Sequence, residues 1–352
     1  MHLSEREGAQ VVTARLAYEI RGHADRMTSP MPTVSVVMPV YNGRKFLEEA
    51  ILSIRNQSLR DLELIVVDNG STDGSYDIAA RHADEDPRVR VLRLDHPGVA
   101  AALQTGIEAA RAPWVARMDA DDISLPDRLR RQMEFLAQHP DLGALGTYGW
   151  IIGERGNRVG MFRAGPTSVE AFLRKRTENK LIYLLSSSVV FSRDLAIALG
   201  GHRQDYAPAE DVDFWTRIAD THVVLTIPEP LVCYRIHLSA ASTKHSALQA
   251  ENARRARVNA ARRRSELPEF TIEEFREFER ADSRLVRLKR FLSVRGQYCY
   301  RKGGAMLANG RPDGVLWLAL GATIAPSQIF RKLRRQSPLR VLATRISESL
   351  AN

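Results

Sequence analysis

Hydrophobic and polar positions alternate in blocks along the first third of the chain. Short, nearly continuous apolar runs are typical of parallel strands buried on both faces, and they occur at residues 33–40, 62–68, 89–94 and 113–118. Between them, residues 45–58 place their apolar positions on one face of a helix, and a second helix is predicted over about 99–110. The alternation predicts an α/β fold with a Rossmann-like, doubly wound, mostly parallel sheet and helices on both faces.

Polar turns follow three of these strands, at Tyr41-Asn42, Asp68-Asn69 and Asp119-Ala120-Asp121. Ligands of open α/β sheets bind beyond the carboxyl ends of the strands, so the three turns are expected to line one crevice. The chain has no GxGxxG after its first strand and no GxxxxGK[ST]. Neither a dinucleotide fingerprint nor a P-loop therefore accounts for the crevice.

Three carboxylates crowd the turn at residues 118–122, MDADD. Like charges this close repel and raise one another's pKa, so a cation or a solvated turn has to relieve the cost. An isolated Asp-x-Asp is more often a capping or solvated turn than a metal site. The residues alone leave both interpretations open.

The composition, 44% apolar over 352 residues, suffices for a folded core. Cys233 and Cys299 have no metal spacing, which favours free thiols in a reducing compartment. The first thirty residues lack the apolar core of a signal peptide, and no later run is long enough to cross a bilayer. We expect a cytoplasmic protein in which residues 1–31 form a flexible leader.

The net charge of +9 belongs to the C-terminal part of the chain, because residues 251–352 hold 22 lysines and arginines against 10 acidic residues. This part reads mostly as helices. Apolar residues around 316–330 precede the basic residues Arg331, Lys332, Arg334 and Arg335. Such a mixture suits an anionic membrane surface, and equally a set of helices that pack back on the parent domain with their basic residues in solvent.

Five blocks carry a resemblance to a known family, and they read VSVVMPVYNG, ELIVVDNGSTDGS, ARMDADDISLPDRL, AEDVDFW and YRIHLSAAS. In order and spacing they closely resemble the family 2 glycosyltransferases of GT-A fold, in particular bacterial members that build lipopolysaccharide or capsule. The resemblance covers about residues 33–243. It implies a catalytic domain over 32–245, followed by a helical basic region over 246–352.

The resemblance implies transfer of a sugar from a nucleoside-diphosphate donor to an acceptor hydroxyl, with inversion at the anomeric carbon. Uridine is the family's commonest base. The acceptor would be a saccharide or a lipid-linked saccharide, and the enzyme could then lie at the inner face of the membrane. No nucleic-acid partner is expected.

Residue roles also follow from the resemblance. Pro39 and Tyr41 match the segment that packs on the base, and Asp68 matches the carboxylate that binds the base edge. Three residues match the ligands that hold Mn²⁺ or Mg²⁺ against the donor diphosphate, and they are Asp119, Asp121 and His237. Hard oxygen ligands favour these ions over zinc. Arg235 would contact phosphate; His237 on its own would be a surface or core histidine.

Glu210 and Asp211 lie in the first turn of a predicted helix whose apolar face includes Phe214 and Trp215. Taken alone they could simply stabilise the helix N-terminus. By resemblance, Asp211 is the general base that removes the acceptor proton, and Glu210 positions the acceptor. Asp213 is expected to be a solvated or structural acid of the same turn.

Secondary expectations concern the neighbours of these residues. Asp122 would cap the next turn, and Arg117 would pair with an acid or a phosphate. The chain departs from the family pattern at Gln104, where asparagine is usual, and at Ser186, where histidine is frequent.

Two other classes of function compete. A pI near 9.8 suggests nucleic-acid binding through the basic helices, although no nucleic-acid module is recognisable. A sugar nucleotidyltransferase would also be an α/β enzyme with metal-binding acids, but the glycine-rich nucleotide loop of that class is missing.

Overall fold

The first four strands form where the apolar runs predict them. The computed structural model describes residues 31–95, 98–240 and 245–326, and the predicted leader (1–30) and the cluster Arg331 to Arg335 lie outside these residues. The elements of the first half are β1 (Val34–Val40), α2 (Arg44–Arg55), β2 (Leu62–Asp68), α3 (Ser75–Glu85), β3 (Val89–Arg93), α4 (Val99–Ala109) and β4 (Trp114–Arg117). All of them except α3, which the sequence did not predict, agree with their predicted positions to within about three residues.

These strands form a parallel half-sheet in the order β3-β2-β1-β4. Along the chain, β2 and then β3 are added on one side of β1, and β4 is added on the other side. Right-handed crossovers therefore put α4 on the face opposite α2 and α3. A Cβ on Gly106 would lie 2.3 Å from Val37 Cγ1, so only glycine lets α4 lie this close to β1.

The second half of the sheet is mixed, a feature that the sequence did not predict. Its elements are β5 (Ile123–Ser124), α5 (Arg128–Gln138), β6 (Leu142–Ile152), β7 (Arg158–Phe162), α6 (Val169–Thr177), the 3-10 turn η1 (Ser186–Ser188), β8 (Val190–Ser192), α7 (Arg193–Ala198), η2 (Gln204–Tyr206), α8 (Glu210–Thr221) and β9 (Val223–Arg235). β8 runs antiparallel to both β4 and β6, whereas β9 is parallel to β6 and antiparallel to β5. The sheet thus continues β4-β8-β6-β9-β5, with β7 beside β6.

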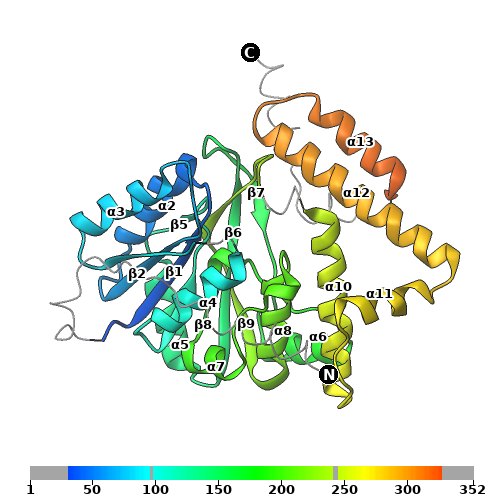
Figure 1. Ribbon diagram of the computed structural model, residues 1–352, viewed down its shortest axis with the longest axis horizontal. Coiled ribbons are helices and arrows are strands. Elements are labelled where there is room, and N and C mark those ends of the chain that lie inside the picture. The colour runs from blue at the N-terminus through cyan, green and yellow to red at the C-terminus, as the bar shows by residue number, and fades with distance from the viewer. Residues whose placement is uncertain (1–30, 96–97, 241–244, 327–352) are drawn as a thin grey trace, which may run out of the picture.

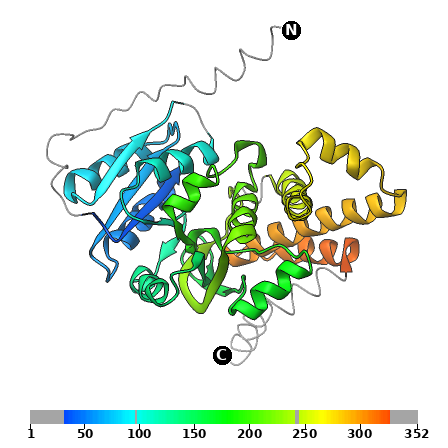
Figure 2. The same ribbon diagram turned by 90° about the horizontal axis from the view of Figure 1, so that it is seen from below.

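The C-terminal region is helical, as expected, and lies against one side of the sheet domain (Figure 1, yellow to orange). It consists of α10 (Ser246–Arg264), α11 (Ile272–Arg280), α12 (Arg284–Ala308) and α13 (Gly314–Ile324). α10 packs on α8, and α12 and α13 form an antiparallel pair (Figures 1 and 2). Within the described residues, no helix combines the length and the apolar character that a bilayer crossing requires.

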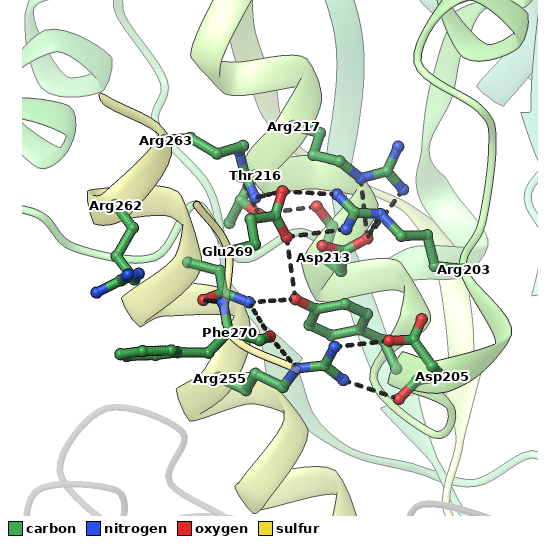
Figure 3. Close-up of polar contacts among 12 residues, drawn as sticks. Arg203, Asp205, Asp213, Thr216, Arg217, Arg255, Arg262, Arg263, Glu269 and Phe270 are labelled. Atoms are coloured by element: carbon green, nitrogen blue, oxygen red, sulfur yellow. Dashed lines mark hydrogen bonds and ion pairs between the residues drawn. The ribbon is translucent and has the colours of Figure 1, made fainter. Parts of the chain in front are cut away.

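A polar network joins α10 and the segment after it to α8 (Figure 3). Buried Asp213 accepts from Arg217 Nε at 2.9 Å, and Arg203 lies between Asp213 and Glu269. Arg263 of α10 donates to Glu269 at 3.0 Å. Asp213 is therefore a structural acid. It is buried and not solvated, and Arg203 and Arg217 form ion pairs with its carboxylate.

The end of α12 is bonded to the sheet domain close to the YRIH block. Asn309 Oδ1 accepts from Glu154 N at 2.6 Å, and its Nδ2 donates to the carbonyl of Ile236 at 3.2 Å. Asn157, in the turn between β6 and β7, donates to the carbonyl of Ala308 at 3.1 Å. These contacts show that the end of α12 packs on the parent domain.

Candidate active site

A cavity of about 1430 Å³ opens beyond the carboxyl ends of β1, β2 and β4. Its walls include the three polar turns that the sequence predicted to share a crevice. They also include residues of α8, of the segment after β9 and of α10 and α12. Among the residues with predicted roles, those that line the cavity are Pro39, Tyr41, Asp119, Asp121, Glu210, Asp211, Arg235 and His237.

The predicted base site lies at the ends of β1 and β2. Tyr41 is 55% exposed and presents its ring to the cavity, beside Asn42 and Asn69. Asp68 is fully buried one residue before Asn69, and among the described residues its carboxyl oxygens make no hydrogen bond of standard geometry. Burial raises the pKa of Asp68, and Ser71 and then Arg93, at 3.7 Å, oppose the rise. A buried carboxylate has several acceptor sites, so an N–H of a base can still bind to it.

Two buried arginines offset the charge of the acidic turn. Arg117 Nε donates to Asp119 Oδ1 at 3.1 Å, and its Nη1 lies 3.5 Å from Glu210 Oε1. Burial opposes the charge of Arg117, yet Asp119, Glu210 and Asp211 together raise its pKa. Arg128 lies beneath the same turn and donates to the carbonyl of Arg117 at 3.0 Å. Sequence reasoning missed Arg128, because a fully buried arginine in a helix reads as a surface charge.

Asp121 and His237 are in contact in the cavity wall, with Asp121 Oδ2 at 2.9 Å from His237 Nε2. Nδ1 of His237 lies 2.7 Å from Ser239 Oγ. With the proton on Nε2, the ring donates to Asp121; with the proton on Nδ1, the Ser239 hydroxyl accepts the hydrogen bond and Nε2 has a lone pair that can bind a cation. Two adjacent ligands of an octahedral ion lie about 3 Å apart, a spacing that this pair matches.

Asp119 does not join that pair, because its carboxylate is turned to Arg117. Nowhere in residues 31–95, 98–240 and 245–326 do three His, Cys, Asp or Glu side chains gather as they would around a metal ion. The predicted three-ligand set is therefore not assembled in the structure. The two residues that do meet fit a site that substrate oxygens and water complete, which is how Mg²⁺ is usually bound.

Arg235 and Asp122 have structural surroundings that differ from their predicted roles. Each nitrogen of the Arg235 guanidinium already donates to the protein, and the acceptors are Asp121 O, Gly153 O, Glu154 O and Glu49 Oε2. The side chain is also buried against Phe46, which leaves it poorly placed for a phosphate. Asp122 caps no turn: it accepts from the backbone N–H of Arg235 at 2.7 Å and from Ser187 Oγ. Both residues hold the acidic turn against the end of β9.

Glu210 and Asp211 begin α8, as the sequence predicted, and both face the cavity. Glu210 is 4% exposed and lies beside Arg117. Asp211 is less buried; it accepts a hydrogen bond from the backbone N–H of Val212 at 2.7 Å and a second one from Ser186 Oγ. The predicted base is thus oriented by two donors and still borders the open space of the cavity.

Three consecutive serines in η1 link the two acidic segments. Ser186 donates to Asp211 and Ser187 to Asp122, while Ser188 Oγ accepts from Thr147 N at 2.9 Å. Ser186, which departs from the family pattern, therefore touches the predicted base directly. Gln104, the other departure, is not among the residues that line the cavity.

Comparisons with known proteins give the family of this chain. Residues 35–197 match the family model described as glycosyl transferase family 2. The O-antigen biosynthesis glycosyltransferase WbnJ of Escherichia coli is 30% identical over 228 residues, which cover 61% of this chain and 83% of WbnJ. The chain belongs to glycosyltransferase family 2. Another relative, the uncharacterized glycosyltransferase MJ1057 of Methanocaldococcus jannaschii, is 31% identical over 209 residues, which cover 58% of this chain and 71% of MJ1057.

Solved structures share the fold of this family 2 glycosyltransferase. The mannosyltransferase PcManGT from Pyrobaculum calidifontis, in complex with GDP-Man and Mn²⁺, has a TM-score of 0.53 at 22% identity. The match covers 86% of this chain and 83% of the PcManGT chain. S. aureus TarS 1–349 in complex with UDP has a TM-score of 0.50 at 16% identity, with coverage of 86% and 91%. The expected α/β fold of GT-A type is confirmed.

Because Glu210 is buried, we expect the stability of this glycosyltransferase to depend on pH. Burial raises the pKa of Glu210 to about 7 from 4.5, Asp211 adds to the rise and Arg117 opposes it. The folded protein then binds this proton more tightly than the unfolded chain, so the free energy of unfolding falls as the pH rises from about 4.5 to about 7. Glu210→Gln is expected to remove up to about 3 kcal/mol of this fall. Urea unfolding across this range, without metal or nucleotide, measures it.

Glu170→Gln is the matched control for this experiment, because the Glu170 side chain is 89% exposed. It is expected to leave the pH profile of the wild type unchanged. Parallel profiles for Glu210→Gln and the wild type would contradict a raised pKa at Glu210.

Proposed function

We propose that this family 2 glycosyltransferase is an inverting, metal-dependent enzyme that moves a sugar from a nucleoside-diphosphate donor, with UDP as the first candidate, to an acceptor hydroxyl. The observation that carries the proposal is the convergence of Tyr41, Asp121, His237 and Asp211 on one cavity. The glycosyltransferase class itself follows from the family. The family assignment favours it over nucleic-acid binding and over nucleotidyl transfer.

In the proposed reaction, Asp211 accepts the proton of the acceptor hydroxyl while the acceptor oxygen forms a bond to the anomeric carbon. The bond from that carbon to the diphosphate oxygen breaks, and the nucleoside diphosphate leaves from the opposite face, which inverts the configuration. Ser186 orients Asp211 for this step, and Glu210 with Arg117 fixes the start of α8. Tyr41 and Pro39 would pack on the base, and Asp68 would accept from its edge.

Asp121 and His237 are the residues that would hold Mn²⁺ or Mg²⁺, with Asp119 beside them. When bound, this ion would offset the charge that develops on the departing diphosphate. The presence of Mn²⁺ and GDP-Man in the PcManGT complex, and of UDP in that of TarS, supports a nucleotide sugar and a divalent ion as ligands here.

The acceptor that we propose is a saccharide or a lipid-linked saccharide in cell-surface polysaccharide synthesis, since WbnJ serves O-antigen biosynthesis. Residues 32–245 would be the catalytic domain and 246–352 the acceptor-side helical region. Apolar residues exposed on α12 and α13, such as Leu288, Phe291 and Leu316, together with the basic residues of α12, favour contact with an anionic membrane surface. We accordingly place the enzyme on the cytoplasmic face of the membrane.

Thermal unfolding of the full chain with nucleoside diphosphates tests the donor site. UDP, GDP, CDP and dTDP are each added with Mn²⁺ and again with EDTA, because a ligand that binds only the folded state raises the unfolding midpoint. One nucleotide is expected to raise the midpoint with Mn²⁺ and to lose most of this effect with EDTA. Equal midpoints in all conditions would contradict the donor site.

A further inference from the structure

One face of α10 is polar and largely buried, although the helix has a strongly basic sequence. Its members lie three or four positions apart, and they are Gln249, Asn252, Arg255 and Asn259. Three of them, Asn252, Arg255 and Asn259, are at most 4% exposed. A buried amide or guanidinium costs free energy unless hydrogen bonds satisfy it. The acceptors of this face therefore show which part of the protein α10 holds.

The acceptors lie in the loop that leads into α8. Four consecutive carbonyls of this loop, at residues 205–208, each accept a hydrogen bond from the polar face of α10. Asn252 Nδ2 donates to the two central carbonyls, at 3.0 and 2.9 Å. Arg255 and Gln249 donate to the outer two, both at 3.1 Å, and Figure 3 shows Arg255 against Asp205. A loop without a partner strand needs such donors for its carbonyls, and α10 supplies them.

Apolar packing continues this contact into the first turn of α8. Ala256 of α10 is fully buried in one cluster with Tyr206, Ala209 and Val212. Ala209 and Val212 stand directly before and after the two acids of this turn, Glu210 and Asp211. The segment that carries the predicted base is thus packed on α10 from both sides along the chain.

The start of α8 has no side-chain cap of its own. Ala209 is the N-cap residue, and it has no side-chain oxygen that could accept from the first N–H groups of the helix. On the side of the sheet, Ser186 donates to Asp211, and Arg117 lies 3.5 Å from Glu210. The place of Asp211 therefore depends on these contacts and on the loop that α10 holds, which ends three residues before it.

We propose that α10 positions the predicted base, with Asn252 as a positioning residue of the proposed reaction. Asn252 does not line the cavity, so its effect on Asp211 passes through the loop. The inference rests on the proposed function, because it takes Asp211 as the group that accepts the proton. It gives α10 a part in catalysis as well as in the cavity wall.

Asn252→Ala tests this inference in the full chain. The rate is the release of nucleoside diphosphate from UDP-glucose, UDP-N-acetylglucosamine or GDP-mannose with Mn²⁺, where water replaces the acceptor hydroxyl. The water oxygen bonds to the anomeric carbon, its proton goes to Asp211, and the bond from that carbon to the diphosphate breaks. The maximal rate per folded molecule is expected to fall about tenfold, while the KM of the donor stays within about twofold. An unchanged rate per folded molecule would overturn the proposal.

Hydrogen exchange measures the positioning without any substrate. In Asn252→Ala, the amides of residues 205–213 are expected to exchange faster than in the wild type, and those of β1 and β2 at the same rate. Gln249→Ala removes one of the four carbonyl contacts, and the same change is expected in a smaller degree. It decides the question if Asn252→Ala does not fold. Wild-type exchange of residues 205–213 in the folded variants would overturn the proposal.

Arg193→Ala is the matched control. Arg193 also donates to two backbone carbonyls, those of Ile107 and Glu108, at 3.2 and 3.1 Å. These lie at the end of α4 and outside the cavity wall. The rate per folded molecule and the exchange of residues 205–213 are expected to match the wild type. A tenfold loss of rate in this variant as well would show that the rate follows stability in general, which would overturn the assignment to Asn252.

Asp211→Asn separates the two proposals. Equal rates in the wild type and in Asp211→Asn would be a failure of the proposed function, because another group would then remove the proton. A slow Asp211→Asn beside an Asn252→Ala of wild-type rate would leave the proposed function standing and overturn the positioning role of α10.

Discussion

Asp211→Asn is expected to lower the rate of sugar transfer by about 10³-fold, because an amide cannot accept the proton of the acceptor hydroxyl. The change keeps the size of the side chain, and the amide oxygen can still accept the hydrogen bond from Ser186. Nucleotide binding is expected to stay at the wild-type level. The measurement is the initial rate of transfer from the donor that the thermal screen selects, together with the midpoint shift given by its nucleotide.

The matched control is Asp194→Asn, since the Asp194 side chain on α7 is 93% exposed and lies outside the cavity wall. It is expected to transfer sugar at the wild-type rate. Near-normal transfer by Asp211→Asn would show that another group removes the proton, and Glu210 would be the next residue to replace.

Asp121→Ala is expected to weaken metal-dependent donor binding by about 100-fold or more, because it removes a proposed metal-binding carboxylate that is also in contact with His237. In the thermal assay, the midpoint shift with nucleotide and Mn²⁺ should fall to the value measured with EDTA. His237→Ala is expected to act in the same direction.

Asp141→Ala serves as control for this prediction, because Asp141 is an exposed acid in the turn before β6. Its variant is expected to keep the full Mn²⁺-dependent shift. If Asp121→Ala kept that shift, the pair formed by Asp121 and His237 would not be the metal site. If replacing Asp119 removed the Mn²⁺-dependent shift instead, the metal site would be assigned to Asp119, beside Arg117.

The parallel half of the sheet could be predicted because each strand is a long apolar run and each helix has one apolar face. The mixed half carries much weaker signals. β8 has three residues and β5 has two, too few for a period to be recognised. β6 contains three glycines, Gly143, Gly146 and Gly149, which lower its strand propensity. Its place between β8 and β9 is set by long-range pairing.

The motifs identified the candidate site residues, but the sequence did not predict which of these residues are in contact. Asp121 and His237 are 116 positions apart, so nothing in the local pattern predicts that they meet. The same holds for Ser186 and Asp211. Arg235 illustrates the opposite case, since a basic residue beside a predicted phosphate site proves to be enclosed by backbone carbonyls. The sequence identifies the chemical groups of such residues, whereas the fold determines which other groups they contact.

The cavity is shared between two parts of the chain that can change independently. The walls near Tyr41 and Asp121 come from the sheet, whereas those near Gln249 and Arg301 come from helices added after its last strand. Under the proposed function, substitutions in α10 and α12 would therefore alter the acceptor side of the cavity and leave the donor side unchanged. The limit to this freedom is α8, whose first turn carries Asp211 and whose later residues are held by arginines of the added helices. A lineage that exchanged its acceptor would have to keep those arginines, or replace them together with Asp220, the acid of α8 that Arg263 and Arg264 bind.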